Sequence, residues 1–152
     1  MTPDERPRVL IVEDELLLVD ALEHAVAQSG GDAIGCALTS GEAVRMAALD
    51  RPDLALVDVH LGDGPTGVDA ARMLAGECGA VVLFMTANVK RLPEDYAGAC
   101  GVMSKPYTDH GLRRALTYVM DCIRDGHAVR QPPNGLILSP AFAAQWAVRP
   151  RA

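Results

Sequence analysis

Two kinds of apolar pattern alternate along most of the chain. Short runs of β-branched and aliphatic residues predict strands that are buried on both faces of a sheet. These runs are Arg8–Val12, Ala33–Leu38, Leu54–Val57, Ala80–Met85 and Gly101–Ser104. After each run, apolar residues recur mostly at helical spacing and predict helices. The predicted helices run from Leu16 to the stop at Ser29-Gly30-Gly31, from a cap at Ser40 to Leu49, and over Val68–Glu77, about Val89–Ala99 and Asp109–Arg124.

Five strands that alternate with five helices predict an α/β domain of the flavodoxin-like, doubly wound kind. We expect one parallel sheet of five strands, in the order 2-1-3-4-5, with helices on both faces. This domain is predicted to cover residues 1–125. Residues 126–152 carry no acidic residue and are expected to form a C-terminal extension, too short to fold independently.

The extension itself contains two predicted elements. Leu136–Leu138 resembles a short strand, and Ser139 followed by Pro140 is typical of the capped start of a short helix. Phe142 and Trp146 are four residues apart and are expected to share one face of that helix. We expect this face to pack on the domain. The alternative is that it docks on a partner protein or on a second copy of the chain, in which case the protein would form a homodimer.

Composition narrows the class of protein. The chain has 152 residues, a net charge of −6 and 49% hydrophobic residues, which is typical of one soluble domain. The longest apolar stretch, Gly79–Met85, is too short to span a membrane, and the N-terminus lacks a secretory signal, so we expect a cytoplasmic protein. The negative charge and the 28 residues after Arg124 disfavour DNA binding. The scattered cysteines are expected to be reduced, buried thiols: Cys36, Cys78, Cys100 and Cys122.

Chemically active residues follow the predicted strands at the point where each strand ends. Glu13 and Asp14 follow the first strand, Asp58 the third, Thr86 the fourth and Lys105 the fifth. Because strands one and three are neighbours in the expected sheet, the three carboxylates should meet at one edge. Like charges at close range require a proton or a cation, and oxygen ligands near solvent favour Mg²⁺. With a lysine and a hydroxyl nearby, these residues suit phosphoryl transfer.

These motifs together resemble the receiver domains of two-component response regulators. The resemblance covers about Pro7 to Asp125 and rests on separated motifs in the family's order. Val-Glu13-Asp14 is similar to the acidic pair after the first strand, and Leu-Val-Asp58-Val-His-Leu to the phosphoacceptor segment. Met-Thr86-Ala87 is similar to the switch hydroxyl and the small residue after it, and Lys105-Pro106 to the family's lysine and proline.

The resemblance implies a role for each acidic residue. Asp58 would accept a phosphoryl group from a phosphohistidine on a sensor histidine kinase or a histidine phosphotransfer protein. Asp14, Asp58 and the backbone carbonyl of His60 would bind Mg²⁺, and Glu13 would hold a water on the metal. The protein would then be a signalling switch that catalyses only its own phosphorylation and dephosphorylation.

The resemblance also implies that Lys105 would pair with the phosphoryl group, and that Thr86 would turn inward and donate a hydrogen bond to it. Two positions depart from the family's pattern. Val102 stands where an aromatic switch residue often lies, although Tyr107 is near enough in sequence to contribute. Pro93 interrupts the fourth predicted helix, so the output surface is expected to differ from the common one.

We interpret the chain as a stand-alone receiver whose output is the binding of an effector protein. A phosphate sink or relay intermediate is the main alternative, and a receiver-like scaffold that is never phosphorylated is another. The histidines are expected to be solvated or capping groups rather than phosphoryl donors: His24, His60, His110 and His127.

A glycine motif suggests a further alternative, a dinucleotide-binding oxidoreductase. Gly62-Asp-Gly64-Pro-Thr-Gly67 has the G-x-G-x-x-G spacing and lies between a predicted strand and a predicted helix. Pro65 lies inside the motif, however, and no acidic residue ends the next strand. We therefore interpret it as a turn-rich loop that lets the acidic site approach the backbone.

Overall fold

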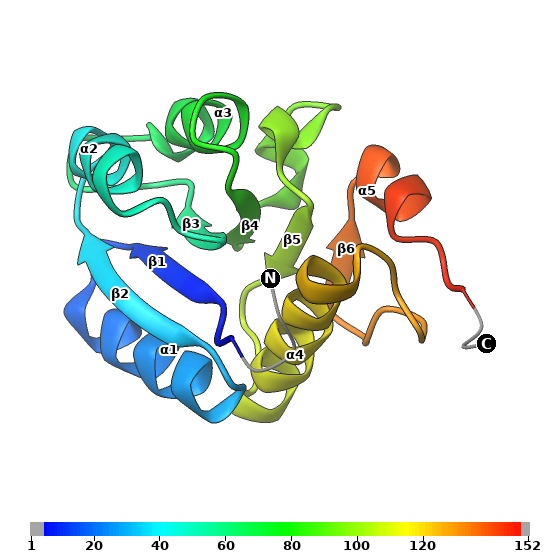
Figure 1. Cartoon of the computed structure of the whole chain (residues 1–152). Coiled ribbons are helices and arrows are strands. Elements are labelled where there is room, and N and C mark those ends of the chain that lie inside the picture. Colours follow the sequence, from blue (N-terminus) through cyan, green and yellow to red (C-terminus); the bar gives the residue numbers. More distant parts are fainter. Residues whose placement is uncertain (1–4, 150–152) are drawn as a thin grey trace.

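A single twisted sheet forms the centre of the protein. The structure, a computed structural model, describes residues 5–149. Among these residues the sheet has six strands (Figure 1): β1 Arg8–Val12, β2 Asp32–Ala37, β3 Leu54–Asp58, β4 Val81–Thr86, β5 Gly101–Ser104 and β6 Leu136–Leu138. Their order is β2-β1-β3-β4-β5-β6. The first five strands are parallel, which confirms the predicted order 2-1-3-4-5, whereas β6 is antiparallel to β5.

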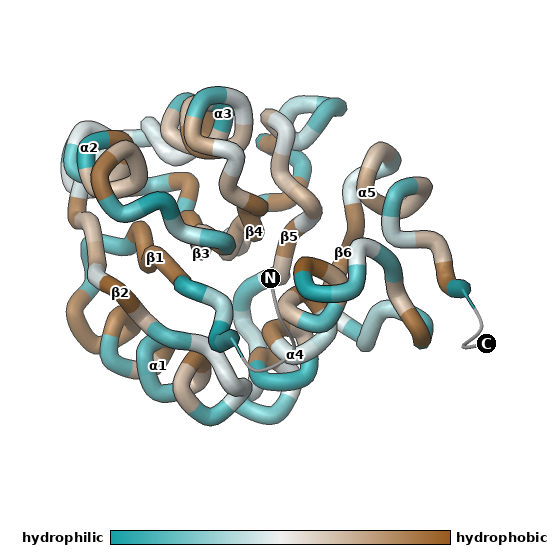
Figure 2. The backbone as a smooth tube through the Cα atoms, viewed as in Figure 1, coloured by the Kyte–Doolittle hydropathy of each residue, from teal (hydrophilic) through white to brown (hydrophobic). Residues whose placement is uncertain are grey.

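Helices cover both faces of the sheet. Residues 5–149 contain five α-helices: α1 Leu16–Gln28, α2 Ser40–Asp50, α3 Gly67–Gly76, α4 Asp109–Asp125 and α5 Pro140–Gln145. α1 and α4 lie on one face, and α2 and α3 on the other (Figure 1). The parallel strands contribute side chains to both cores because successive side chains point to opposite faces. In β1, Val9 and Ile11 pack under α1 and α4, and Leu10 and Val12 under α2 and α3. Figure 2 shows the hydrophobic strands between helices with more polar outer surfaces.

The cap of α2 differs by one residue from the prediction. Thr39, not Ser40, is the N-cap, and its hydroxyl oxygen accepts a hydrogen bond from the amide of Glu42 at 3.2 Å. A cap needs extended backbone, and Thr39 has it, with φ −134° and ψ 162°. The Ser40 hydroxyl is free to bond elsewhere and donates to Asp63.

The predicted helix at about Val89–Ala99 is wrong. The structure has two single 3₁₀ turns there, η1 Val89–Arg91 and η2 Tyr96–Gly98. Pro93 supplies no amide for a helix, and Tyr96 and Ala97 adopt left-handed φ values of 54° and 52°. The domain therefore contains four of its five predicted helices, and the fifth α-helix of the described residues, α5, belongs to the extension.

The C-terminal extension packs on the domain. β6 pairs with β5, and the amide of Ser139 donates to the carbonyl of Cys100 at 2.8 Å. Ser139 caps α5 as predicted, with its hydroxyl oxygen 3.3 Å from the amide of Phe142. Trp146 is only 3% exposed and lies in the core under α1 and α4, with its ring edge-on to Phe142 at 4.9 Å. The aromatic pair therefore faces the body of this chain.

Two further expectations concern thiols and membranes. Cys100 and Cys122 are buried, but Cys36 and Cys78 are only partly buried, and no disulfide joins cysteines in the described part of the chain. Within residues 5–149, none of the helices is both long enough and apolar enough to cross a bilayer.

Candidate functional site

The carboxyl ends of the parallel strands bring the predicted site residues to one edge of the sheet. Glu13 follows β1, Asp58 ends β3 and Lys105 follows β5. The Nζ atom of Lys105 lies 3.1 Å from Oδ2 of Asp58 and 3.6 Å from Oε2 of Glu13. These three side chains form the centre of the site. Asp14 follows Glu13 in the chain and is exposed.

Glu13 is the most deeply buried charge-bearing group of the site. The residue is 2% exposed, and its Oε1 accepts a hydrogen bond from the amide of Glu15 at 3.1 Å. Burial, followed by the neighbouring Asp58 carboxylate, raises the pKa of Glu13 to about 7. The site therefore holds more negative charge than its surroundings stabilise, and it favours a proton or a cation.

Lys105 supplies part of the missing positive charge. Burial acts to lower the pKa of its ammonium group, but the carboxylates of Asp58 and Glu13 outweigh burial and hold this pKa above its usual value. The backbone also fixes Lys105, because its amide donates to the carbonyl of Thr86 at 2.9 Å. The ammonium is therefore charged and positioned against Asp58.

The loop after β3 wraps closely around Asp58. The amide of His60 donates to Oδ1 of Asp58 at 3.1 Å, so both carboxylate oxygens have a donor. Gly67 lies so close that a Cβ atom there would be 2.0 Å from the carbonyl oxygen of Asp58. The glycine-rich segment thus works as predicted, by letting two stretches of backbone approach each other.

Asp63 fixes the same loop and was not predicted from the sequence. Its carboxylate accepts hydrogen bonds from the hydroxyls of Ser40 and Thr66, which lower its pKa to about 2. The Asp-x-x-Thr spacing, which is typical of local side-chain turns, is the one sequence signal that points to the bond with Thr66.

The switch positions have distinct surroundings. Thr86 is 5% exposed, and its hydroxyl oxygen accepts from the amide of Asn88 at 3.1 Å. Val102 is fully buried on the side of α2 and α3. Tyr107 is partly buried, and with Pro106 and Leu18 it lines a mainly apolar pocket of about 430 Å³ beside Lys105. The aromatic group nearest the site therefore follows the lysine rather than preceding it.

The residues present fit a hydrated divalent cation. Their donor atoms are carboxylate and backbone oxygens, which Mg²⁺ prefers, and the carboxylates of Glu13 and Asp58 share a single lysine. Among residues 5–149, no three acidic, histidine or cysteine side chains are placed so that they could hold a metal ion by themselves. Such a site suits Mg²⁺, because this ion keeps several of its waters.

Comparison with known proteins agrees with this geometry. The chain is 39% identical over 92 residues to the phyllosphere-induced regulator PhyR of Methylorubrum extorquens, an alignment that covers 60% of this chain and 34% of PhyR. It is 34% identical over 121 residues to the transcriptional regulatory protein PdtaR of Mycobacterium tuberculosis, covering 78% of this chain and 58% of PdtaR. The chain thus spans from about a third to about three fifths of these relatives.

A solved structure and a protein family also match this chain. The signal receiver domain of a modulated diguanylate cyclase from Desulfovibrio desulfuricans G20 superposes with a TM-score of 0.66 at 31% identity, covering 79% of this chain and 98% of that domain. The response regulator receiver domain family matches residues 9–117. Since that match includes all the strand-end residues described above, the chain belongs to the family of response regulator receiver domains.

Proposed function

We propose that Asp58 is the phosphoacceptor and that its donor is a phosphohistidine on a sensor histidine kinase or a histidine phosphotransfer protein. The observation that carries this proposal is the Lys105 ammonium, 3.1 Å from Oδ2 of Asp58. A carboxylate oxygen of Asp58 attacks phosphorus, the bond from phosphorus to the histidine nitrogen breaks, and an acyl phosphate forms. Lys105 then pairs with the new phosphoryl oxygens.

Mg²⁺ belongs to this proposal. Asp14, Asp58 and the backbone carbonyl of His60 would hold it, and Glu13 would hold one of its waters. When bound, the ion supplies positive charge that offsets the negative charge of the phosphoryl oxygens. The chain's own groups position the acceptor, because the amide of His60 and the ammonium of Lys105 bond to different oxygens of Asp58.

The output we propose is a phosphorylation-dependent change in protein binding. A new phosphoryl group adds charge and acceptor oxygens, to which the Thr86 hydroxyl can turn and donate. Val102 provides no aromatic switch, so Tyr107, beside Lys105, is the proposed substitute. One relative of solved structure is the anti-anti-sigma factor PhyR from Bartonella quintana. An effector protein is accordingly our proposed partner, and the cytoplasm stays the predicted location.

Intact-mass measurement tests the acceptor role. The full chain is incubated with a small-molecule phosphodonor, with Mg²⁺ or with EDTA, and is compared with Asp58→Asn. Asp20→Asn is the matched control, because Asp20 is an exposed carboxylate on α1. We expect one phosphoryl group on wild type and on Asp20→Asn, and none on Asp58→Asn or in EDTA.

The same measurement decides against the proposal in two ways. An equal adduct on Asp58→Asn would place the phosphoryl group elsewhere. No adduct on wild type, even with the purified cognate kinase, would favour a scaffold that acts without phosphorylation. Asp14→Asn separates the metal role, since it should raise the Mg²⁺ concentration needed for half-maximal labelling.

A further inference from the structure

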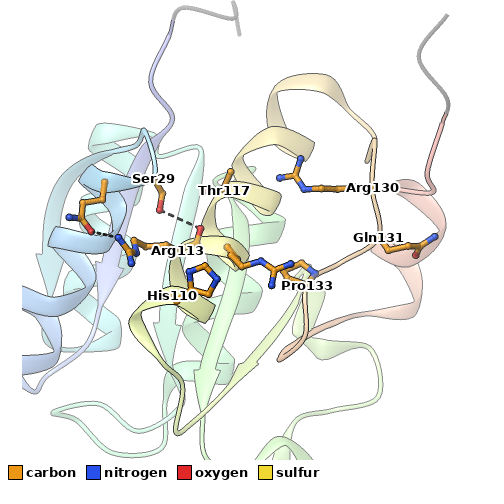
Figure 3. A pocket seen from close by; sticks show the side chains of 9 residues that line it. Ser29, His110, Arg113, Thr117, Arg130, Gln131 and Pro133 are labelled. Carbon is orange, nitrogen blue, oxygen red and sulfur yellow. Dashed lines mark hydrogen bonds between the residues drawn. The ribbon is translucent and has the colours of Figure 1, made fainter.

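A basic pocket lies where the C-terminal extension crosses α4. Its volume is about 370 Å³, and it lies between α4, the end of α1 and the segment at 130–133 (Figure 3). One face of α4 supplies His110, Arg113, Arg114 and Thr117, whose spacings of three and four residues place them side by side. The extension supplies Arg130 from the opposite side. The pocket therefore depends on the extension as well as on the domain.

The charge of this pocket is opposite to that of the protein. The whole chain has a net charge of −6, yet three of the nine residues that line the pocket are arginines and none is acidic. Arg130 is paired with Asp121 at 3.0 Å. Within residues 5–149, neither Arg113 nor Arg114 forms an ion pair, so at least two positive charges are not balanced by a contact.

Two of the three arginines, Arg113 and Arg130, are also held in place before any ligand arrives, whereas Arg114 is exposed. The guanidinium of Arg113 donates to Oε1 of Gln28 at 3.2 Å, and its backbone carbonyl accepts from the hydroxyl of Ser29 at 3.4 Å (Figure 3). Arg130 bonds to Asp121 and lies over the ring of Tyr118, 6.0 Å from its centroid. Preorganised guanidinium groups lose less conformational entropy when they bind.

From these observations we propose that the pocket binds a small phosphorylated molecule through Arg113 and Arg114. Guanidinium groups match phosphate oxygens in paired hydrogen bonds, and the Thr117 hydroxyl adds a donor. The volume lies in the range of small-molecule sites rather than of extended polymers. A nucleic acid fits poorly because the rest of this acidic chain would repel it. The ligand would bridge α4 and the extension.

Calorimetric titration of the full chain with pyrophosphate tests the proposal. EDTA is present throughout, so that metal at Asp58 does not contribute, and the ionic strength is about 0.15 M, so that weak surface attraction is screened. The pocket variant is Arg113→Gln with Arg114→Gln. The control is Arg45→Gln with Arg91→Gln, which removes the same charge from two exposed positions outside the pocket.

We expect wild type and the control to bind one pyrophosphate with similar affinity, and the pocket variant to bind at least about tenfold more weakly. A thermal unfolding midpoint for each variant shows that it is folded. An equal loss in both variants, or no saturable binding by folded wild type, would overturn the proposal. So would binding only to vesicles that contain phosphatidylinositol phosphate, or only to a short polyglutamate peptide, without binding of free pyrophosphate.

Discussion

Replacing Trp146 with alanine should destabilise the whole domain, although this residue lies in the extension. Its side chain is 3% exposed in the core shared by α1 and α4. A buried aromatic side chain removes about 150–250 Å² from water, and at about 25 cal/mol per Å² this is about 4–6 kcal/mol as an upper bound. Truncations of buried tryptophan typically cost about 3–5 kcal/mol, which is the loss in unfolding free energy we expect.

Urea unfolding followed by circular dichroism measures this loss. With an m-value of about 2 kcal/mol per M, the midpoint should fall by about 2 M. Val148→Ala is the matched control in the same segment, because Val148 is 42% exposed and should change the unfolding free energy by less than about 0.5 kcal/mol. Trp146 is the only tryptophan, so in wild type its fluorescence should change together with circular dichroism. An unchanged midpoint in Trp146→Ala, or fluorescence that changes at lower urea, would refute the packing argument.

Three further predictions test the site and the sheet edge. In metal-free buffer, protonated Glu13 stabilises the fold fully below pH about 4.5, and this contribution is lost as the pH rises through about 7. Between pH 5 and pH 8, the unfolding free energy of Glu13→Gln should therefore rise by up to about 3 kcal/mol relative to that of wild type, measured by unfolding at each pH. A difference that stays constant with pH would contradict the raised pKa of Glu13. Gly101→Ala should lower the unfolding free energy measured in urea by about 1–3 kcal/mol, because its Cβ would lie 2.2 Å from the carbonyl oxygen of Ile137. Gly76→Ala, which has open space around it, should leave the unfolding free energy unchanged. Gly67→Ala should slow labelling of Asp58 in the mass assay by displacing the backbone of Asp58 and Val59, and labelling as fast as in Gly76→Ala would count against this role of the loop.

The parallel sheet and the grouping of its strand-end residues followed from local pattern. Runs such as Leu54–Val57 are apolar throughout because both faces of the strand are buried, and a polar residue, here Asp58, then marks the point where the strand ends. Once the order 2-1-3-4-5 was inferred, Glu13, Asp58 and Lys105 had to come close, and they do. Alternating pattern and topology together were sufficient to predict this arrangement.

The segment between β4 and β5 was not predictable in the same way. Val89, Leu92 and Tyr96 have the apolar spacing of a helix, and they do pack against the core. Their backbone is nevertheless set by Pro93 and by the hydrogen bond from the amide of Ala97 to Asp95 at 3.0 Å. Apolar periodicity reports which side chains face the core, but not whether the amides between them have helical partners.

The sixth strand pairs with β5, the strand that carries Val102. β6 covers the edge of β5 that would otherwise expose unpaired amides and carbonyls, and Val102 stands opposite Ile137 in this pairing. Val102 is fully buried, and Gly101 leaves room for the backbone of Ile137 to approach. A larger aromatic side chain at 102 would have to be accommodated in a closed core. The backbone edge of β5 is therefore shielded by this chain's own C-terminal residues, while the side chain of Val102 fills the core under α2 and α3.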